Sequence, residues 1–264
     1  MATSMGSRED IKEINLMVVG AGGIGTHLLP MLIRASMSLP DNYVVTQLII
    51  VDGDTYELRN LSRQQFTSVA IGRNKADVQV EKIKRLLEPV VDSSRLNHAI
   101  RSFPQYLTEE NLSSCIGMFM HFGNLMIFSG VDNHPCRLLL SRFTERNKEA
   151  NILLFTGGNN ELDGSVHLQG KWNGVSFDKP VEERHPEIAT DKTDDRGALS
   201  CQELQNLQGG EQTIAANAMA AAVMYSWFIS VLTNPEASSD IEDFYYDIRS
   251  MNIRAIRPVK KLGS

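Results

Sequence analysis

Apolar runs and helix-like repeats alternate along the first 156 residues of the chain. Short segments rich in apolar side chains predict buried strands at residues 16–19, 48–51, 97–103, 125–131 and 151–156. Between them, residues 75–87 place apolar side chains near helical period, and residues 135–148 predict a second helix. Strands that alternate with helices are typical of a parallel, doubly wound sheet.

The pattern changes beyond this half of the chain. Glycines and asparagines at residues 157–160 end the alternation, and apolar stretches at 163–168 and 170–175 suggest a hairpin. Residues 178–196 are mostly charged and include two prolines, Pro180 and Pro186, so we expect a mobile loop there.

The last part of the chain predicts one long helix at residues 212–232 and two short strands within 243–258. The predicted fold class is therefore α/β: a doubly wound, mostly parallel sheet with a smaller β-rich extension. We expect one domain over residues 1–264, divided into a nucleotide-binding half at about 11–156 and a second part at about 157–264.

A glycine-rich turn follows the first predicted strand. Its glycines, at positions 20, 22, 23 and 25, let the backbone turn tightly and let a phosphate approach peptide N–H groups. The helix that begins near Ile24 would offer its positive end to that anion. Asp52, at the end of the second strand, is suited to accept hydrogen bonds from ribose hydroxyls. This Rossmann-like pattern alone fits NAD or FAD as well as ATP.

Further polar residues change this interpretation. Asn60, Arg63 and Gln64 follow the second strand, and Lys75 opens the helix at 75–87. Two cations near a phosphate site can neutralise the charge that moves onto a departing pyrophosphate, which hydride transfer does not require. Asp132 ends a later strand and is suited either to hold Mg²⁺ against phosphates or to cap the helix at 135–148.

This constellation resembles the E1-like superfamily, which comprises the ubiquitin-activating enzymes and their bacterial relatives ThiF and MoeB. The resemblance is close from Leu16 to about Asn147. It implies ATP and Mg²⁺ as cofactors, and a role for each matching residue. The nucleotide loop would comprise Gly20, Gly22, Gly23 and Gly25; Asp52 would hold the ribose; Asn60, Arg63, Gln64 and Lys75 would contact the phosphates; and Asp132 would hold the metal.

The resemblance also implies an activity. Such enzymes adenylate a carboxylate, here most simply the C-terminal glycine of a ubiquitin-like β-grasp protein, and they usually form homodimers. A cysteine on a segment that crosses over the nucleotide pocket often takes the acyl group as a thioester before a downstream acceptor. Cys201 follows Ser200 between the charged run and the long helix, where a helix N-terminus could lower a thiol pKa. An incidental buried cysteine is the alternative.

The cysteine count indicates which branch of the superfamily the sequence resembles. The sequence has three cysteines and no Cys-x-x-Cys pair, so it lacks the four thiolates of the structural zinc site that relatives such as MoeB contain. It resembles the zinc-less, small ThiF-type proteins of bacterial gene clusters, including the PRTRC cluster. We expect Cys115 and Cys136 to be structural core residues.

Two other functions are compatible with parts of the sequence. An NAD-dependent dehydrogenase would need the glycine loop and Asp52, and a non-catalytic scaffold would need only the fold. The presence of Arg63, Lys75 and Asp132 together with all the glycines favours the adenylating enzyme over both.

Composition supports a cytoplasmic enzyme. The chain has 264 residues and a formal net charge of −6, which gives no support to a general nucleic-acid surface. No disulfide framework or signal-peptide core is visible. Residues 218–232 are apolar, but they are too short and too rich in alanine for a membrane span, so we expect a buried helix there.

Overall fold

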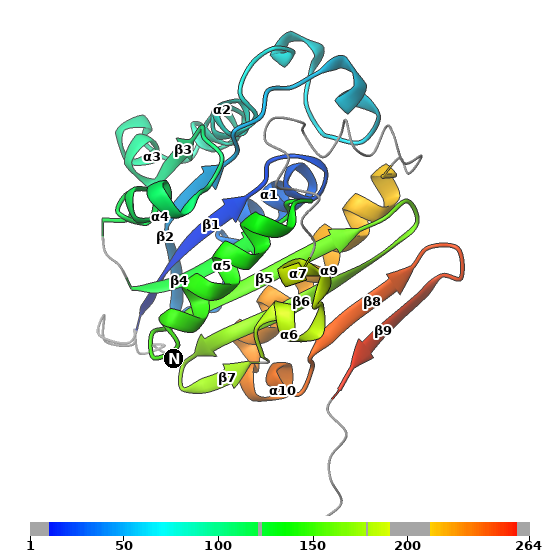
Figure 1. The fold of residues 1–264 in the computed structure, drawn as a ribbon. Helices are drawn as coiled ribbons and strands as arrows, with labels where there is room; N and C mark the ends of the chain where they lie inside the picture. The colour runs from blue at the N-terminus through cyan, green and yellow to red at the C-terminus, as the bar shows by residue number, and fades with distance from the viewer. Residues whose placement is uncertain (1–10, 121–122, 178, 191–211, 258–264) are drawn as a thin grey trace, which may run out of the picture.

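The computed structural model describes residues 11–120, 123–177, 179–190 and 212–257. The strands in these residues form one nine-stranded sheet in the order β3-β2-β1-β4-β5-β6-β8-β9, with β7 paired to β6 (Figure 1). The strand bounds are β1 Lys12–Val19, β2 Tyr43–Val51, β3 Ile100–Phe103, β4 Asn124–Ser129, β5 Ile152–Asn159, β6 Asp163–Trp172, β7 Val175–Phe177, β8 Asp243–Asp247 and β9 Asn252–Ile256.

Helices follow most of the strands. Their bounds are α1 Gly23–Ala35, α2 Lys75–Leu87, α3 Ser93–Ala99, α4 Glu109–Ile116, α5 His134–Arg146, α6 Val181–Arg184, α7 Glu187–Thr190, α9 Ile214–Thr233 and α10 Pro235–Ser239, with short 3-10 turns η2 Leu58–Ser62 and η3 Ser68–Ala70. Strands β3, β2, β1, β4 and β5 are mutually parallel, whereas β6, β7, β8 and β9 pair antiparallel with their neighbours. The predicted α/β class, a mostly parallel sheet with a β-rich extension, is confirmed.

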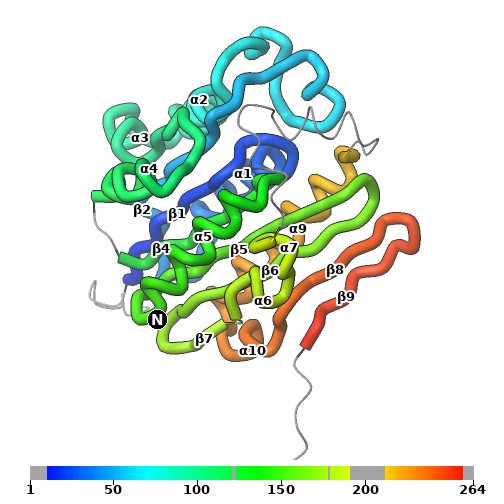
Figure 2. The backbone as a smooth tube through the Cα atoms, in the orientation of Figure 1, coloured from blue at the N-terminus to red at the C-terminus, as the bar shows by residue number. Residues whose placement is uncertain are grey.

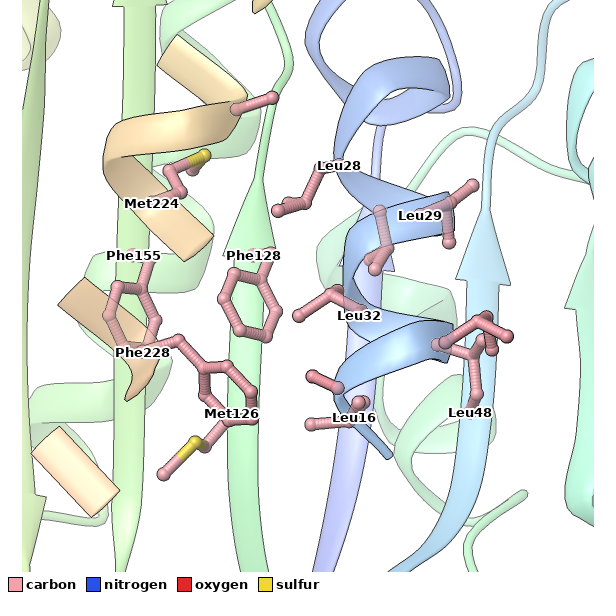
Figure 3. Packing of buried hydrophobic residues seen from close by; sticks show 14 of the residues in the cluster. Leu16, Leu28, Leu29, Leu32, Leu48, Met126, Phe128, Phe155, Met224 and Phe228 are labelled. Atoms are coloured by element: carbon pink, nitrogen blue, oxygen red, sulfur yellow. The ribbon is translucent and has the colours of Figure 1, made fainter. Parts of the chain in front are cut away.

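Consecutive side chains of a strand point to opposite faces of the sheet. Helices cover both faces of the parallel strands, so the side chains on both faces are buried. On one face, Leu16 and Val18 of β1 belong to a core that includes α1, α2 and α9. On the other face, Met17 and Val19 pack with α4 and α5. Figure 3 shows the first core: Phe128 lies between the leucines of α1 and the aromatic and methionine side chains near α9.

The predicted buried helix near the C-terminal end is confirmed as α9. This helix has the length and apolar composition of a membrane span, but half of its most apolar window is buried in the structure. Its side chains Ala220, Met224 and Phe228 are fully buried against α1 and the sheet. The phenyl ring of Phe228 meets that of Phe128 edge-on, with centroids 5.7 Å apart. Helix α9 is therefore a core helix of this fold.

One predicted strand is partly wrong. Residues 97–99 complete helix α3, and the strand begins only at Ile100. The Asp92 side chain accepts hydrogen bonds from the backbone N–H groups of Ser94 and Arg95, so it caps a helix that begins at Ser93. The Asp-Ser-Ser sequence before the apolar positions was the signal for this helix.

The predictions for residues 157–190 need more correction. Strand β5 continues through the glycines to Asn159, because Gly157 and Gly158 pair with Val166 and Ser165 of β6. The expected hairpin at 163–175 is instead the single strand β6, which turns only at residues 173–174 before β7. Figure 2 follows this path along the tube.

The mobile loop expected at 178–196 is wrong for residues 179–190, which form α6 and α7. Val181 and Ile188 are buried, and the Val181 N–H donates to Gln169 Oε1 over 2.8 Å. These two apolar side chains anchor an otherwise charged stretch against α5 and the sheet. The remainder of that predicted loop lies outside the described residues.

Candidate nucleotide site

The turn between β1 and α1 is held so tightly that glycine is required in it. Gly20 has a φ of +94°, and a Cβ on Gly25 would lie 2.0 Å from the carbonyl oxygen of Gly20. A Cβ on Gly23 would lie 2.5 Å from the side chain of Asn217, which comes from α9. Gly22 is the N-cap of α1, and the first turn of this helix contains no acidic side chain. The positive end of the α1 dipole therefore faces the turn, and no acidic side chain of the helix's own first turn opposes it.

Asp52 connects the end of β2 to this turn. Its Oδ2 accepts a hydrogen bond from the Ala21 N–H over 2.6 Å, and its Oδ1 accepts one from the Asp54 N–H over 2.8 Å. Burial raises the pKa of Asp52 to about 6, although the charge of Lys75 opposes the shift. Each oxygen retains a second lone pair, so the carboxylate can still accept from ribose hydroxyls.

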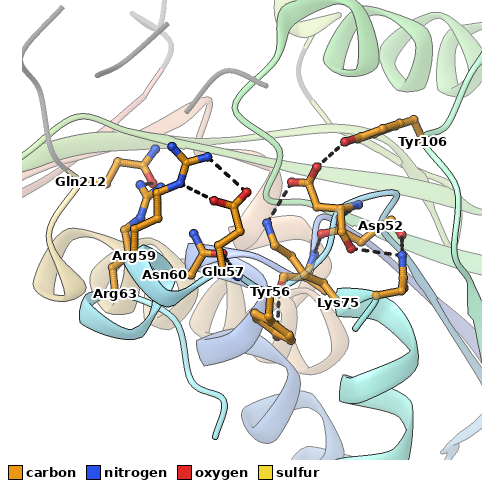
Figure 4. Close-up of polar contacts among 12 residues, drawn as sticks. Asp52, Tyr56, Glu57, Arg59, Asn60, Arg63, Lys75, Tyr106 and Gln212 are labelled. Atoms are coloured by element: carbon orange, nitrogen blue, oxygen red, sulfur yellow. Dashed lines mark hydrogen bonds and ion pairs between the residues drawn. The ribbon is translucent and has the colours of Figure 1, made fainter. Parts of the chain in front are cut away.

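Lys75 forms an ion pair with Asp54, with 2.8 Å between Nζ and Oδ2 (Figure 4). The Tyr106 hydroxyl donates to the other oxygen of Asp54. Burial alone would raise the pKa of Asp54, but Lys75 and the Tyr106 hydrogen bond outweigh it, so the pKa is lowered. Asp54 follows the turn after β2, and its carboxylate positions the lysine.

Asn74 links the start of α2 to the segment that contains Asp52 and Asp54. We did not identify it as a site residue from the sequence. Its side-chain oxygen accepts from the Asp77 N–H and caps α2, and its amide donates to the carbonyl oxygens of Asp52 and Asp54 over 2.9 and 3.1 Å. A polar residue directly before a predicted helix is a recognisable N-cap, so the signal was present. The cap fixes Lys75 at the first position of α2, directly beside Asp52.

The three predicted phosphate contacts after β2 have different surroundings. Asn60 is fully buried, and its Oδ1 accepts from the Glu57 N–H over 3.0 Å, which closes the η2 turn. Arg63 donates from Nη1 to Gln212 Oε1 over 3.2 Å, just before α9. Gln64 is buried beside Gly22, and its Oε1 has no hydrogen-bond partner among the described residues. An unpartnered buried amide oxygen beside the glycine turn fits a site that takes a polar ligand.

Asp132 lies just beyond the end of β4 and is exposed. The alternative role as a helix cap is wrong, because Asn133 is the N-cap of α5 and accepts from the Cys136 N–H over 2.9 Å. Within the described ranges, no group of three or more His, Cys, Asp or Glu side chains could hold a metal ion. Mg²⁺ usually keeps several waters and needs one or two carboxylates beside the substrate phosphates, so Asp132 alone fits that mode.

The fold brings most of the predicted site residues to one edge of the sheet. Strands β1, β2 and β4 are adjacent and parallel, so the glycine turn, Asp52 and Asp132 all follow carboxyl ends of neighbouring strands. A Cβ on Gly20 would lie 3.1 Å from the Val131 side chain, which links the turn to the Asp132 segment. Cys201 lies outside the described residues. Asn217 and Tyr106 join the site from distant parts of the chain, and no local sequence signal pointed to them.

The glycine turn at a helix N-terminus, the acid after β2 and the cation at the start of α2 define a Rossmann-like nucleotide-binding domain. The model of the ThiF family matches residues 2–262. The chain therefore belongs to the ThiF family, and the resemblance to the E1-like superfamily is confirmed.

Two relatives are similar in sequence to about half of this chain. The ubiquitin-like modifier-activating enzyme 5 of Arabidopsis thaliana is 29% identical over 139 residues, which cover 51% of this chain and 30% of the plant protein. The sulfur carrier protein adenylyltransferase of Thermus thermophilus is 28% identical over 135 residues, which cover 51% of this chain and 42% of that enzyme. The matched region thus spans less than half the length of these relatives.

Solved structures share the fold over nearly the whole chain. A crystal structure of PaaA superposes with a TM-score of 0.62 at 16% identity, covering 94% of this chain and 74% of that one. The structure of Escherichia coli MccB with ATP gives a TM-score of 0.57 at 19% identity, covering 92% and 63%.

Proposed function

We propose that this chain catalyses the ATP-dependent adenylation of a carboxylate. The observation that carries the proposal is the buried Lys75, held by Asp54 at the same strand ends as the glycine turn and Asp52. A dehydrogenase has no need of a buried cation beyond the ribose-binding acid. The names of the relatives, an activating enzyme and an adenylyltransferase, support the same activity.

The reaction joins a substrate carboxylate oxygen to the α-phosphorus of ATP, while the bond from that phosphorus to pyrophosphate breaks. The glycine turn and the α1 N-terminus bind phosphate oxygens, and Asp52 orients the ribose. Lys75 and Arg63 stabilise the negative charge that develops on the leaving pyrophosphate. Mg²⁺ held by Asp132 would supply further charge neutralisation to the phosphates.

The acyl substrate that we propose is the C-terminal glycine of a ubiquitin-like β-grasp protein. This follows the names of the relatives, since one acts on a ubiquitin-like modifier and another on a sulfur carrier protein. After adenylation, the Cys201 thiolate would attack the acyl carbon and displace AMP, and the resulting thioester would pass to a downstream acceptor. We also propose a homodimer in the cytoplasm, and light scattering at twice the chain mass would support the dimer.

Calorimetry and product analysis test the proposal together. Purified chain should bind ATP with Mg²⁺ and show no heat of binding with NAD⁺. Incubation of ATP with a peptide that ends in Gly-Gly should release pyrophosphate, and AMP should appear as the adenylate hydrolyses. Binding of NAD⁺ in place of ATP would favour the dehydrogenase. A chain that binds neither nucleotide would favour the non-catalytic scaffold.

A further inference from the structure

Helices α1 and α9 begin side by side at the candidate nucleotide site. They pack against each other on the same face of the sheet. A Cβ on Gly23, the first residue of α1, would lie 2.5 Å from the side-chain amide of Asn217, which is in the first turn of α9. Neither helix has an acidic side chain in its first turn. The positive ends of two helix dipoles therefore meet at this point, which favours an anion there.

Arg63 adds a cation to the start of α9. Its Nη1 donates to Gln212 Oε1 over 3.2 Å, and Gln212 immediately precedes Thr213, the N-cap of α9. Figure 4 shows Arg63 and Gln212 next to each other. The guanidinium group thus lies at the same end of α9 as Asn217. Two helix N-termini and an arginine are surroundings that suit a bound phosphate.

Asn217 is fully buried, yet one of its polar atoms has no partner. The residue is 0% exposed, and its Nδ2 makes no hydrogen bond with any described residue. Its Oδ1 accepts a hydrogen bond from Asn159 Nδ2 over 3.2 Å. Buried amide N–H groups are nearly always satisfied, and an unsatisfied one costs stability. The open donor thus indicates a ligand that supplies an acceptor.

The neighbouring residues determine which atom of this amide is open. Asn159 Nδ2 also donates to the carbonyl oxygen of Asn160 over 3.3 Å. A carbonyl oxygen only accepts, so Asn159 must present its Nδ2, and the Asn217 atom that it contacts must be the oxygen. The open atom of Asn217 is therefore Nδ2. Asn159 also lines a cleft of about 720 Å³ over the antiparallel strands, so this pair of amides connects the cleft to the glycine turn.

Resting on the proposed adenylation, we propose that Asn217 binds a phosphate of ATP. Its Nδ2 donates to a phosphate oxygen at the N-terminus of α1, and Asn159 holds the amide in the orientation that this bond requires. The part of the chain that follows the parallel strands thereby supplies a direct contact to the nucleotide.

Calorimetric titration with ATP and Mg²⁺, without any acyl substrate, tests the contact. Asn217→Ala should weaken ATP binding roughly ten- to hundredfold, as expected when a hydrogen bond to a charged group is lost. Asn160→Ala is the matched control, because Asn160 is an exposed asparagine beside Asn159 whose side chain donates to Asp163. It should change the affinity by less than about twofold. Urea denaturation without nucleotide shows whether each variant is folded.

The same titration with AMP identifies the phosphate. Equal losses with AMP and ATP assign the contact to the α-phosphate, which the substrate carboxylate attacks. A loss with ATP alone assigns it to the two phosphates that leave as pyrophosphate. Either result supports the assignment, because both place Nδ2 on a phosphate oxygen.

A pair of charge substitutions tests the orientation without removing Asn217. Asn159→Asp replaces the donating group by an acceptor, so the Asn217 amide should rotate and turn its oxygen toward the phosphate. ATP binding should then weaken about fivefold or more. Asn160→Asp adds the same charge at the next residue, whose side chain contacts Asp163 instead, and should weaken binding by less than about twofold. This comparison decides the assignment by itself if Asn217→Ala does not fold.

The assignment is overturned by unchanged ATP affinity in a folded Asn217→Ala chain, by equal effects of Asn159→Asp and Asn160→Asp, or by a wild-type chain that does not bind ATP. Unchanged ATP affinity together with weaker binding of a Gly-Gly peptide would also overturn it and move the donor to the acyl carboxylate. ATP binding that depends on Asn217 in a chain without pyrophosphate exchange would remove the proposed function and leave the assignment in place. Exchange by a folded Asn217→Ala chain with unchanged ATP affinity would do the opposite.

Discussion

Lys75 and Asp54 form an ion pair in which the lysine side chain is 3% exposed and the aspartate side chain is 30% exposed. The lysine is thus almost completely withdrawn from water, while its partner still faces the site. A buried ammonium group needs such a partner, because its desolvation is otherwise too costly. Asp54 therefore keeps the cation in position while no phosphate is present.

Removing this lysine should be costly for both stability and activity. Lys75→Met keeps the apolar stem but leaves Asp54 without its cation, so we expect a loss of about 1–3 kcal/mol in the free energy of unfolding. Arg85→Met removes a cation that is 78% exposed on the same helix and should change stability by less than about 0.5 kcal/mol. Urea denaturation measures both variants. Equal stabilities for the two would show that the buried pair is not required.

The glycine turn should not tolerate a methyl group. Gly25→Ala would place Cβ 2.0 Å from a backbone oxygen, so the turn must shift, at a cost of roughly 1–3 kcal/mol. Gly123→Ala is the matched control, because its Cβ would meet nothing within 4 Å. Thermal unfolding should separate the two variants, and ATP titration should show weaker binding for Gly25→Ala alone. A Gly25→Ala protein with unchanged melting and binding would contradict the tight turn.

The parallel half of the fold was predictable because its strands are buried on both faces. Such strands appear in sequence as continuous apolar runs, as Val18–Val19 and Ile49–Ile50 illustrate. The antiparallel half has one face open to the cleft, so its strands mix polar residues and glycines. Gly157 and Gly158, which we interpreted as a break, pair normally within β5.

The site was predictable only where its residues are close in sequence. The glycine turn, Asp52 and Lys75 form a local motif with a known physical role. Tyr106 and Asn217 reach the site through the folding of distant segments, and periodicity says nothing about them. His167 of β6 is another residue whose contact comes from a distant segment. It is 1% exposed, and its Nδ1 lies 2.9 Å from Asp243 Oδ1, a pairing across 76 residues.

Stability should depend on pH through Asp52. Its pKa is about 6 in the folded chain against 3.8 for the ordinary group, so the folded state binds the proton more strongly. Between these values the folded state holds more protons than the unfolded state, and stability therefore falls as pH rises from 4 to 6. The upper bound is about 3 kcal/mol. Asp52→Asn should lack this component when denaturation midpoints at pH 4 and pH 7 are compared, and parallel curves for the two proteins would contradict it.

The three thiols should differ in reactivity. Burial raises the pKa of Cys115 and of Cys136 to about 12, so neither is a thiolate at neutral pH. If the proposed thioester forms, Cys115→Ala and Cys136→Ala should retain an ATP-dependent covalent adduct with the acyl substrate that thiol reagents remove. Cys201→Ala should lose the adduct while it still adenylates. Gel analysis under non-reducing conditions measures this, and an adduct that survives Cys201→Ala would exclude that residue.

Exchange of labelled pyrophosphate into ATP tests adenylation most directly, because it requires reversible formation of an acyl-adenylate. With Mg²⁺ and the Gly-Gly peptides, exchange should depend on a free terminal carboxylate and should disappear when that carboxylate is amidated. Asp132→Ala should abolish exchange with little effect on folding, since Asp132 is exposed beyond the end of β4. Release of ADP and inorganic phosphate without any exchange would contradict the account.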